Sequence, residues 1–113
     1  MHRKEQIRAY KDTQRPMGVF RVLNTANGRS LVGSSVDISA MLNRQRFQLA
    51  AGGHPDRALQ ADWRECGPDA FVFETLDLLE PSEEPGWDPA ADLRALEAMW
   101  LEKLGRAGER GYR

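Results

Sequence analysis

Cysteine, histidine and long apolar runs are scarce in this chain of 113 residues. It has one cysteine, Cys66, which excludes an internal disulfide, and together with two histidines it cannot supply the four ligands of a structural zinc site. No apolar run approaches the roughly 20 residues of a membrane span, and the polar start of the chain lacks the apolar centre of a secretory signal. We therefore expect one cytoplasmic domain, without membrane contact, that is held together by packing alone.

The charges are nearly balanced over the whole chain but unevenly distributed along it. Lys and Arg number 16 against 17 Asp and Glu, which gives a formal net charge of −1. Residues 1–64 hold 11 of the basic and 5 of the acidic residues, whereas residues 65–113 hold 5 and 12. A positively charged first half attracts phosphates, so the asymmetry favours an anionic partner such as nucleic acid. The alternative is that the two halves fold together and neutralise each other.

The hydrophobic pattern predicts an α+β domain. Residues 17–23 and 30–34 are predicted as the strands of a β-hairpin, because Asn27 and Gly28 between them suit a tight turn with positive φ. Residues 70–79 alternate enough to form a third strand. The expected fold is a small three-stranded antiparallel sheet flanked by helices.

Four helices are predicted around this sheet. One covers residues 2–12 and belongs to an N-terminal helical extension, residues 1–15, which precedes the main domain at 16–113. A second begins after Asp37, whose side chain suits a helix N-cap. This second helix covers residues 38–50, and two more helices of the main domain are predicted at residues 55–65 and 90–104.

Two polar side chains occupy positions where the helical pattern expects apolar ones. In the last predicted helix, Glu97 falls within the apolar arc. A carboxylate there loses hydration, so it must be neutral, bound to a metal, or paired with an arginine at the rim of the arc. In the helix at 38–50, Gln45 also faces inward, where a buried amide usually satisfies a neighbouring backbone group.

His54 and several arginines are further candidates for a functional site. His54 stands at a helix entrance, where the helix dipole and free N–H groups favour anions, although a loop histidine is more often a cap or a surface residue. Arg44 and Arg46 flank the inward stripe of their helix and could lean over a concave site, or they are solvated charges. The candidate phosphate contacts are Arg21, Arg29, Arg44, Arg46, Arg57 and Arg64.

Two tripeptides and the residues that follow them resemble the start of a known nuclease domain. Gly18 to Phe20 reads Gly-Val-Phe, and Leu31 to Gly33, about one hairpin later, reads Leu-Val-Gly before a helix opens. This arrangement resembles the GIY-YIG nuclease domain, a family that includes intron-encoded homing endonucleases and the incision subunit of bacterial excision repair. The resemblance implies the α+β fold described above and hydrolysis of a DNA phosphodiester with one divalent cation such as Mg²⁺ or Mn²⁺.

The resemblance extends from about residue 17 to residue 112 and implies roles for individual residues. The metal-binding glutamate of the family falls on Glu97, in the pattern Glu-x-x-Trp-Leu. The histidine that follows a pair of glycines falls on His54. In such a mechanism the metal and an arginine offset the growing phosphoryl charge, and a phenol relays a proton.

Five other positions depart from the family pattern. Phe20 and Leu31 stand where the family has tyrosines, Met41 where it has an arginine, and Gln45 where it has a histidine. A late asparagine would fall on Arg113. Losing a general acid or base reduces the rate by ~10²–10⁴, and losing a charge-stabilising donor reduces it by about 10²–10³. These losses predict little remaining nuclease activity, although Arg44, one helical turn from Met41, is a partial substitute for the arginine.

The sequence leaves three hypotheses open. The first is a GIY-YIG-like nucleic-acid-binding domain with impaired or absent nuclease activity, which takes DNA in preference to RNA. The second is an active divalent-metal-dependent endonuclease with Glu97 as metal ligand, His54 as base or phosphate contact, and Arg44 in place of the lost arginine. The third is a protein–protein adaptor on the same scaffold, with Trp87 and the acidic, proline-rich loop at 80–89 as its contact surface.

Overall fold

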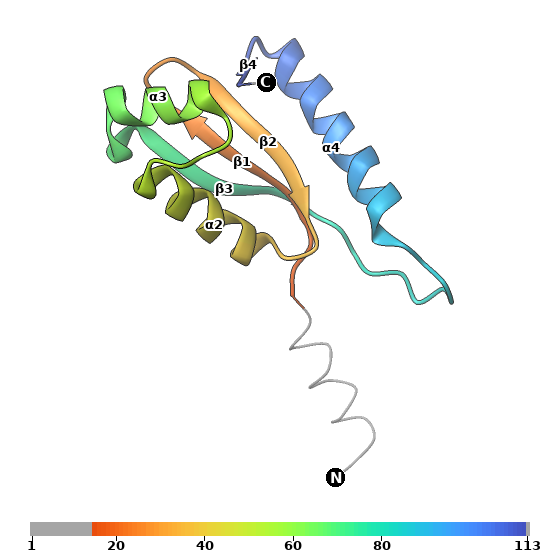
Figure 1. Ribbon diagram of the computed structural model, residues 1–113. Helices are drawn as coiled ribbons and strands as arrows, with labels where there is room; N and C mark the ends of the chain where they lie inside the picture. The colour runs from red at the N-terminus through yellow and green to blue at the C-terminus, as the bar shows by residue number, and fades with distance from the viewer. Residues whose placement is uncertain (1–14, 113) are drawn as a thin grey trace.

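The computed structural model describes residues 15–112 (Figure 1). The strands are β1 (Gly18–Asn24), β2 (Arg29–Ser35), β3 (Phe71–Leu78) and β4 (Arg110–Gly111). The helices are α2 (Ile38–Ala51), α3 (Arg57–Cys66) and α4 (Pro89–Arg106), with a short 3₁₀ helix, η1 (Pro68–Ala70), before β3. The helix predicted at 2–12 lies outside the described residues.

The strands form one mixed sheet in the order β3-β1-β2-β4. β1 pairs antiparallel with both β2 and β3, which confirms the predicted three-stranded sheet and its hairpin. In the turn of that hairpin Gly28 has φ +76°, whereas Asn27 does not adopt positive φ. β4 is an addition to the prediction: it pairs parallel with β2, beside Arg29 and Ser30. Two residues are too few for an alternating pattern to reveal a strand.

Both faces of β1 are buried, so the sheet is covered on two sides. Consecutive side chains of a strand point to opposite faces, and Val19 and Phe20 are only 0% and 4% exposed. Figure 1 shows α2 and α3 together on one side of the sheet and α4 on the other, along β2 and β1. The main core cluster consists of Val22, Leu31, Leu49, Leu59, Phe71 and Tyr112.

Each of the three α-helices begins at an aspartate cap. Asp37, Asp56 and Asp88 accept a hydrogen bond from a backbone N–H in the first turn of α2, α3 and α4, respectively. The prediction for Asp37 is thereby confirmed, and α3 begins at Arg57, after its cap, two residues later than predicted. Across residues 15–112, none of the helices has the length and apolar character needed to span a bilayer.

Candidate functional site

The motif glycines lie where neighbouring atoms leave no room for a side chain. A Cβ on Gly33 would stand 2.7 Å from the ring of Phe20, its partner across the hairpin. A Cβ on Gly18 would stand 2.0 Å from the carbonyl oxygen of Asp77 on β3. Phe20 and Leu31, at the positions that the family gives to tyrosines, are buried apolar side chains. This part of the motif therefore serves packing and presents no hydroxyl group.

His54 is buried at the junction of α2 and α3, and both of its ring nitrogens have hydrogen-bond partners. Nδ1 accepts the backbone N–H of Asp56 at 3.0 Å, and Nε2 lies 2.5 Å from Oε1 of Gln45. Because Nδ1 acts as an acceptor, the proton is assigned to Nε2, which donates to the Gln45 oxygen. The ring is therefore neutral in this arrangement, and adding a proton at Nδ1 would break its bond to Asp56.

Two glutamine side chains complete this buried cluster, which we call the His54 cluster (His54, Gln45 and Gln60). Gln60 Oε1 accepts the backbone N–H of His54 at 3.0 Å, and its Nε2 donates to the carbonyl oxygen of Leu49 at 3.0 Å. Gln45 Nε2 lies 3.5 Å from the sulfur of Met41. The cluster thus ties α2 to α3 through groups whose donors and acceptors face one another.

Glu97 lies on α4 and is half-buried, which is less burial than a position inside the apolar arc predicts, because the neighbouring Leu101 is itself 48% exposed. One turn earlier Leu93 is buried, and one turn later the Trp100 indole N–H donates to the carboxylate of Asp77 on β3 at 3.0 Å. Within residues 15–112 the Glu97 carboxylate has no hydrogen-bond or ion-pair partner. Of the three alternatives for Glu97, the salt bridge to an arginine is therefore not formed in this part of the chain, and the partial exposure leaves the carboxylate accessible to water.

Glu97 is also the only residue proposed to bind a metal. In the described part of the chain no three side chains of His, Cys, Asp or Glu are placed to hold an ion together. Mg²⁺ commonly binds one or two carboxylates and completes its shell with waters and substrate phosphates. The described residues therefore provide no closed protein site for an ion, and Glu97 offers a single carboxylate.

Two of the predicted phosphate contacts are engaged within the fold. Arg21 forms ion pairs with Glu74 and, at 2.8 Å, with Glu109. The guanidinium of Arg29 lies 4.4 Å from the centre of the Tyr112 ring and 3.9 Å from the carboxylate of Asp62. Their positive charges are thus offset by carboxylates of the same chain.

The other four predicted phosphate contacts are exposed on α2 and α3. Residues 38–55 contain no Asp or Glu, so the charge of α2 and the loop after it is positive only. Arg46 places its guanidinium 4.7 Å from the centre of the Phe73 ring, and Arg64 donates to the carbonyl oxygen of Gly52 at 3.2 Å. The exposed set is Arg44, Arg46, Arg57 and Arg64.

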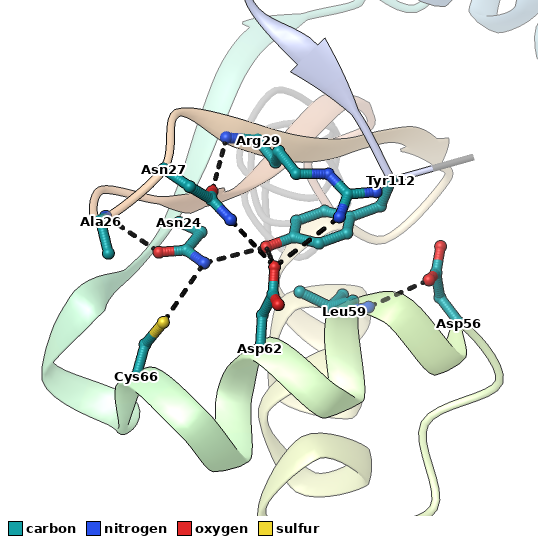
Figure 2. A network of polar contacts seen from close by, with 9 residues as sticks. All are labelled: Asn24, Ala26, Asn27, Arg29, Asp56, Leu59, Asp62, Cys66 and Tyr112. Carbon is teal, nitrogen blue, oxygen red and sulfur yellow. Dashed lines mark hydrogen bonds and ion pairs between the residues drawn. The ribbon is translucent and has the colours of Figure 1, made fainter.

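Sequence reasoning missed a polar network around Tyr112 (Figure 2). The buried hydroxyl donates to Asp62 at 2.8 Å and accepts from Asn24 at 3.0 Å, and Asn27 also donates to Asp62 at 3.0 Å. Burial, reinforced by the Asp62 carboxylate, raises the pKa of Tyr112 to about 12. Asn24 and Asp62 lie 88 and 50 residues from Tyr112 along the chain, so no local sequence pattern indicates these hydrogen bonds.

Trp87, the contact residue of the adaptor hypothesis, is half-buried beside α4. Its indole N–H donates to the carboxylate of Asp92 at 2.9 Å. This contact anchors the end of the acidic loop to the first turn of α4. The adaptor role itself stays a prediction.

The strand order, the hairpin and the three flanking helices together define a domain with the GIY-YIG fold. The chain is similar to the catalytic domain of the homing endonuclease I-TevI, with a TM-score of 0.64 and 23% identity over 83% of this chain and 94% of that one. A mutant of the same catalytic domain, described as that of an intron endonuclease, gives a TM-score of 0.66 and 20% identity over 84% and 90% of the two chains. No protein-family model matches the sequence, and no curated protein matches it.

Proposed function

We propose that this chain is a GIY-YIG-like domain that binds nucleic acid, DNA in preference to RNA, and whose nuclease activity is impaired or absent. The observation that carries the proposal is the bonding of His54. A general base needs a lone pair directed at the substrate or its attacking water. Nδ1 of His54 accepts a backbone N–H instead, and the ring is buried.

The remaining positions of the family pattern support the same conclusion. Phe20 and Leu31 carry no hydroxyl, and Met41 carries no positive charge. One missing acid or base reduces the rate by ~10²–10⁴, and one missing charge-stabilising donor by about 10²–10³. The combined loss leaves little of the hydrolytic mechanism.

The exposed arginines support binding. Arg44, Arg46, Arg57 and Arg64 lie on α2 and α3 beside a segment without acidic residues. Each phosphate that an arginine neutralises releases condensed counterions, which gives affinity that falls as salt rises. The catalytic domains that this chain resembles belong to an endonuclease, which agrees with a nucleic-acid partner.

A salt titration tests this proposal. Labelled duplex DNA and duplex RNA are titrated with the full chain between about 50 and 200 mM salt, and binding is expected at low salt with a steep decrease on raising it. Replacing Arg44 and Arg57 by Gln should lower the log–log salt slope by about 0.9 for each phosphate that is no longer neutralised. Arg94→Gln, an exposed arginine on α4, is the matched control and should leave the slope unchanged. Absence of binding at low salt would contradict the proposal.

A second candidate function is metal-dependent DNA cleavage, and the unpartnered Glu97 carboxylate favours it. Arg44, one helical turn from Met41, would have to supply the missing charge. Plasmid nicking in the presence of Mg²⁺ or Mn²⁺ that disappears in Glu97→Gln would support this candidate. Nicking that persists in the variant would point to a contaminating nuclease.

A further inference from the structure

The outward face of α2 carries a large aromatic side chain that does not pack into the core. Phe47 is 74% exposed, more than any other large hydrophobic residue of the described chain. Gln45 faces inward, and two residues further along a helix the direction has turned by about 200°. Phe47 therefore points away from the sheet and from the His54 cluster.

Positive charge accompanies Phe47 along this face. Arg44 lies one helical turn before it, so the two side chains are neighbours on the helix surface. Arg46 directly precedes it in the sequence and is also exposed, but it points about 100° away around the helix, with its guanidinium over the Phe73 ring of β3, so it borders this face. Because residues 38–55 include no carboxylate, no acidic side chain of α2 competes for these arginines.

A hollow continues the same face toward α3. Ala50 and Ala51, one turn after Phe47, line a hollow of about 500 Å³ between the ends of α2 and α3. A second aromatic residue, Trp63, and a further arginine, Arg64, line its opposite side. None of the lining residues is acidic. Arginines and aromatic rings thus occur together on the outer side of α2 and at the hollow beside it.

This combination fits unpaired nucleotides better than a duplex or a protein. Proteins bind single strands with a positive groove that follows the phosphates and with aromatic rings on which bases stack. In a duplex the base faces are already stacked on one another, so no base face is free to stack on an exposed phenyl ring. A stable protein interface has an apolar centre built from several side chains, whereas Phe47 is the single exposed large hydrophobic residue of α2, with Arg44 and Arg46 next to it.

We propose that the Phe47 face, defined as Arg44, Arg46, Phe47 and the hollow lined by Trp63 and Arg64, binds single-stranded nucleic acid. One base stacks on Phe47, and the adjoining phosphates are held by Arg44 and Arg64. This inference rests on the proposed nucleic-acid binding and names its substrate class.

Comparison of one oligonucleotide in two forms tests the inference. A labelled oligothymidylate of about 16 nucleotides and its duplex with oligoadenylate are titrated with the full chain, with Phe47→Ala, and with Leu101→Ala. Leu101 is 48% exposed on α4 and is the matched control for the loss of an exposed hydrophobic side chain. Equal unfolding midpoints of the three proteins establish that each is folded.

The full chain is expected to prefer the single strand. Phe47→Ala should weaken single-strand binding about 5- to 150-fold, the effect of losing one base–aromatic stack, without altering the salt slope. Phe47→Trp should retain the affinity, and Leu101→Ala should leave it unchanged. Arg44→Gln should lower the single-strand salt slope by about 0.7.

Several outcomes would overturn the inference, and they are distinguishable. Salt-dependent duplex binding with no effect of Phe47→Ala on either form refutes base stacking and leaves the proposed function intact. No binding of any nucleic acid at low salt refutes both. A dimer in sedimentation that Phe47→Ala dissociates assigns the face to a second copy of the chain and refutes the inference.

Discussion

His54 and Glu97 are the two residues to which the resemblance to the GIY-YIG domain assigns a part in hydrolysis, yet their surroundings are opposite. Both His54 ring nitrogens are bonded to groups of the same chain, and the ring is buried. The Glu97 carboxylate is half-exposed and without a partner in residues 15–112. A polar group whose partners are all internal stabilises the fold, whereas one without partners is open to a ligand. The residue type by itself therefore does not determine whether a side chain is available to a ligand.

The largest effect that would test this contrast is expected for His54→Ala. The substitution leaves Gln45 Oε1 and the Asp56 N–H without their partner, and each buried unsatisfied group costs about 1–3 kcal/mol. The free energy of unfolding, measured by urea denaturation, should fall by roughly 2–5 kcal/mol. Asn43→Ala, an exposed polar residue on α2, is the control and should stay within about 0.5 kcal/mol of the unsubstituted chain. An unchanged midpoint for His54→Ala would show that the cluster does not hold the junction.

Tyr112→Phe should have an intermediate effect that depends on pH. It removes the hydroxyl between Asn24 and Asp62, at a cost of about 1–2 kcal/mol near neutral pH. The pKa of Tyr112 is raised from 10.0 to about 12 in the folded state, so the unfolded chain loses this proton first as pH rises. The stabilisation is complete below pH 10.0 and is lost as pH rises to about 12.

The unsubstituted chain and Tyr112→Phe are compared by urea denaturation at several pH values between 10.0 and about 12. The free energy of unfolding of the unsubstituted chain should fall more steeply than that of Tyr112→Phe between pH 10.0 and about 12. Tyr10, the other tyrosine, is present in both proteins, so the difference reports Tyr112 alone. Parallel curves would contradict the assigned role of the hydroxyl.

The smallest effect on stability is expected for Glu97→Gln. The structure gives this carboxylate no ion pair within residues 15–112, so the unfolding free energy should change by less than about 0.5 kcal/mol. The measurement is urea denaturation at neutral pH, side by side with His54→Ala. A loss above about 1 kcal/mol would mean that Glu97 has a structural partner, and the contrast between the two sites would fail.

Most of the fold could be predicted because its signals are local. The three strands, the hairpin and the three helices of the main domain were each placed within two residues of their observed ends. Apolar periodicity, the Asn-Gly turn and the aspartate cap at Asp37 involve residues close together in the sequence. β4 was missed because its pairing with β2 joins residues that are far apart along the chain.

The candidate site could be predicted only in part. The helical pattern indicated that Gln45 faces inward, and the structure confirms it; the pattern also placed Glu97 in the apolar arc, where the structure leaves it only half-buried. It could not indicate that His54 would be bonded by Gln45 and by the Asp56 N–H, since that requires the ends of two helices to meet. The same holds for Arg21, whose carboxylate partners come from β3 and from the segment after α4.

By itself the sequence determined most of the secondary structure, the burial of particular positions and the lack of a hydroxyl at Phe20 and Leu31, because these follow from residue type and spacing. Only the tertiary structure decided which polar side chains have hydrogen-bond or ion-pair partners within the described residues and which do not. It gave His54 and Tyr112 hydrogen-bond partners, left Phe47 exposed, and left the half-buried Glu97 carboxylate without a partner in residues 15–112. The reason is that a hydrogen bond depends on distances between atoms, which a chain acquires only when remote segments pack.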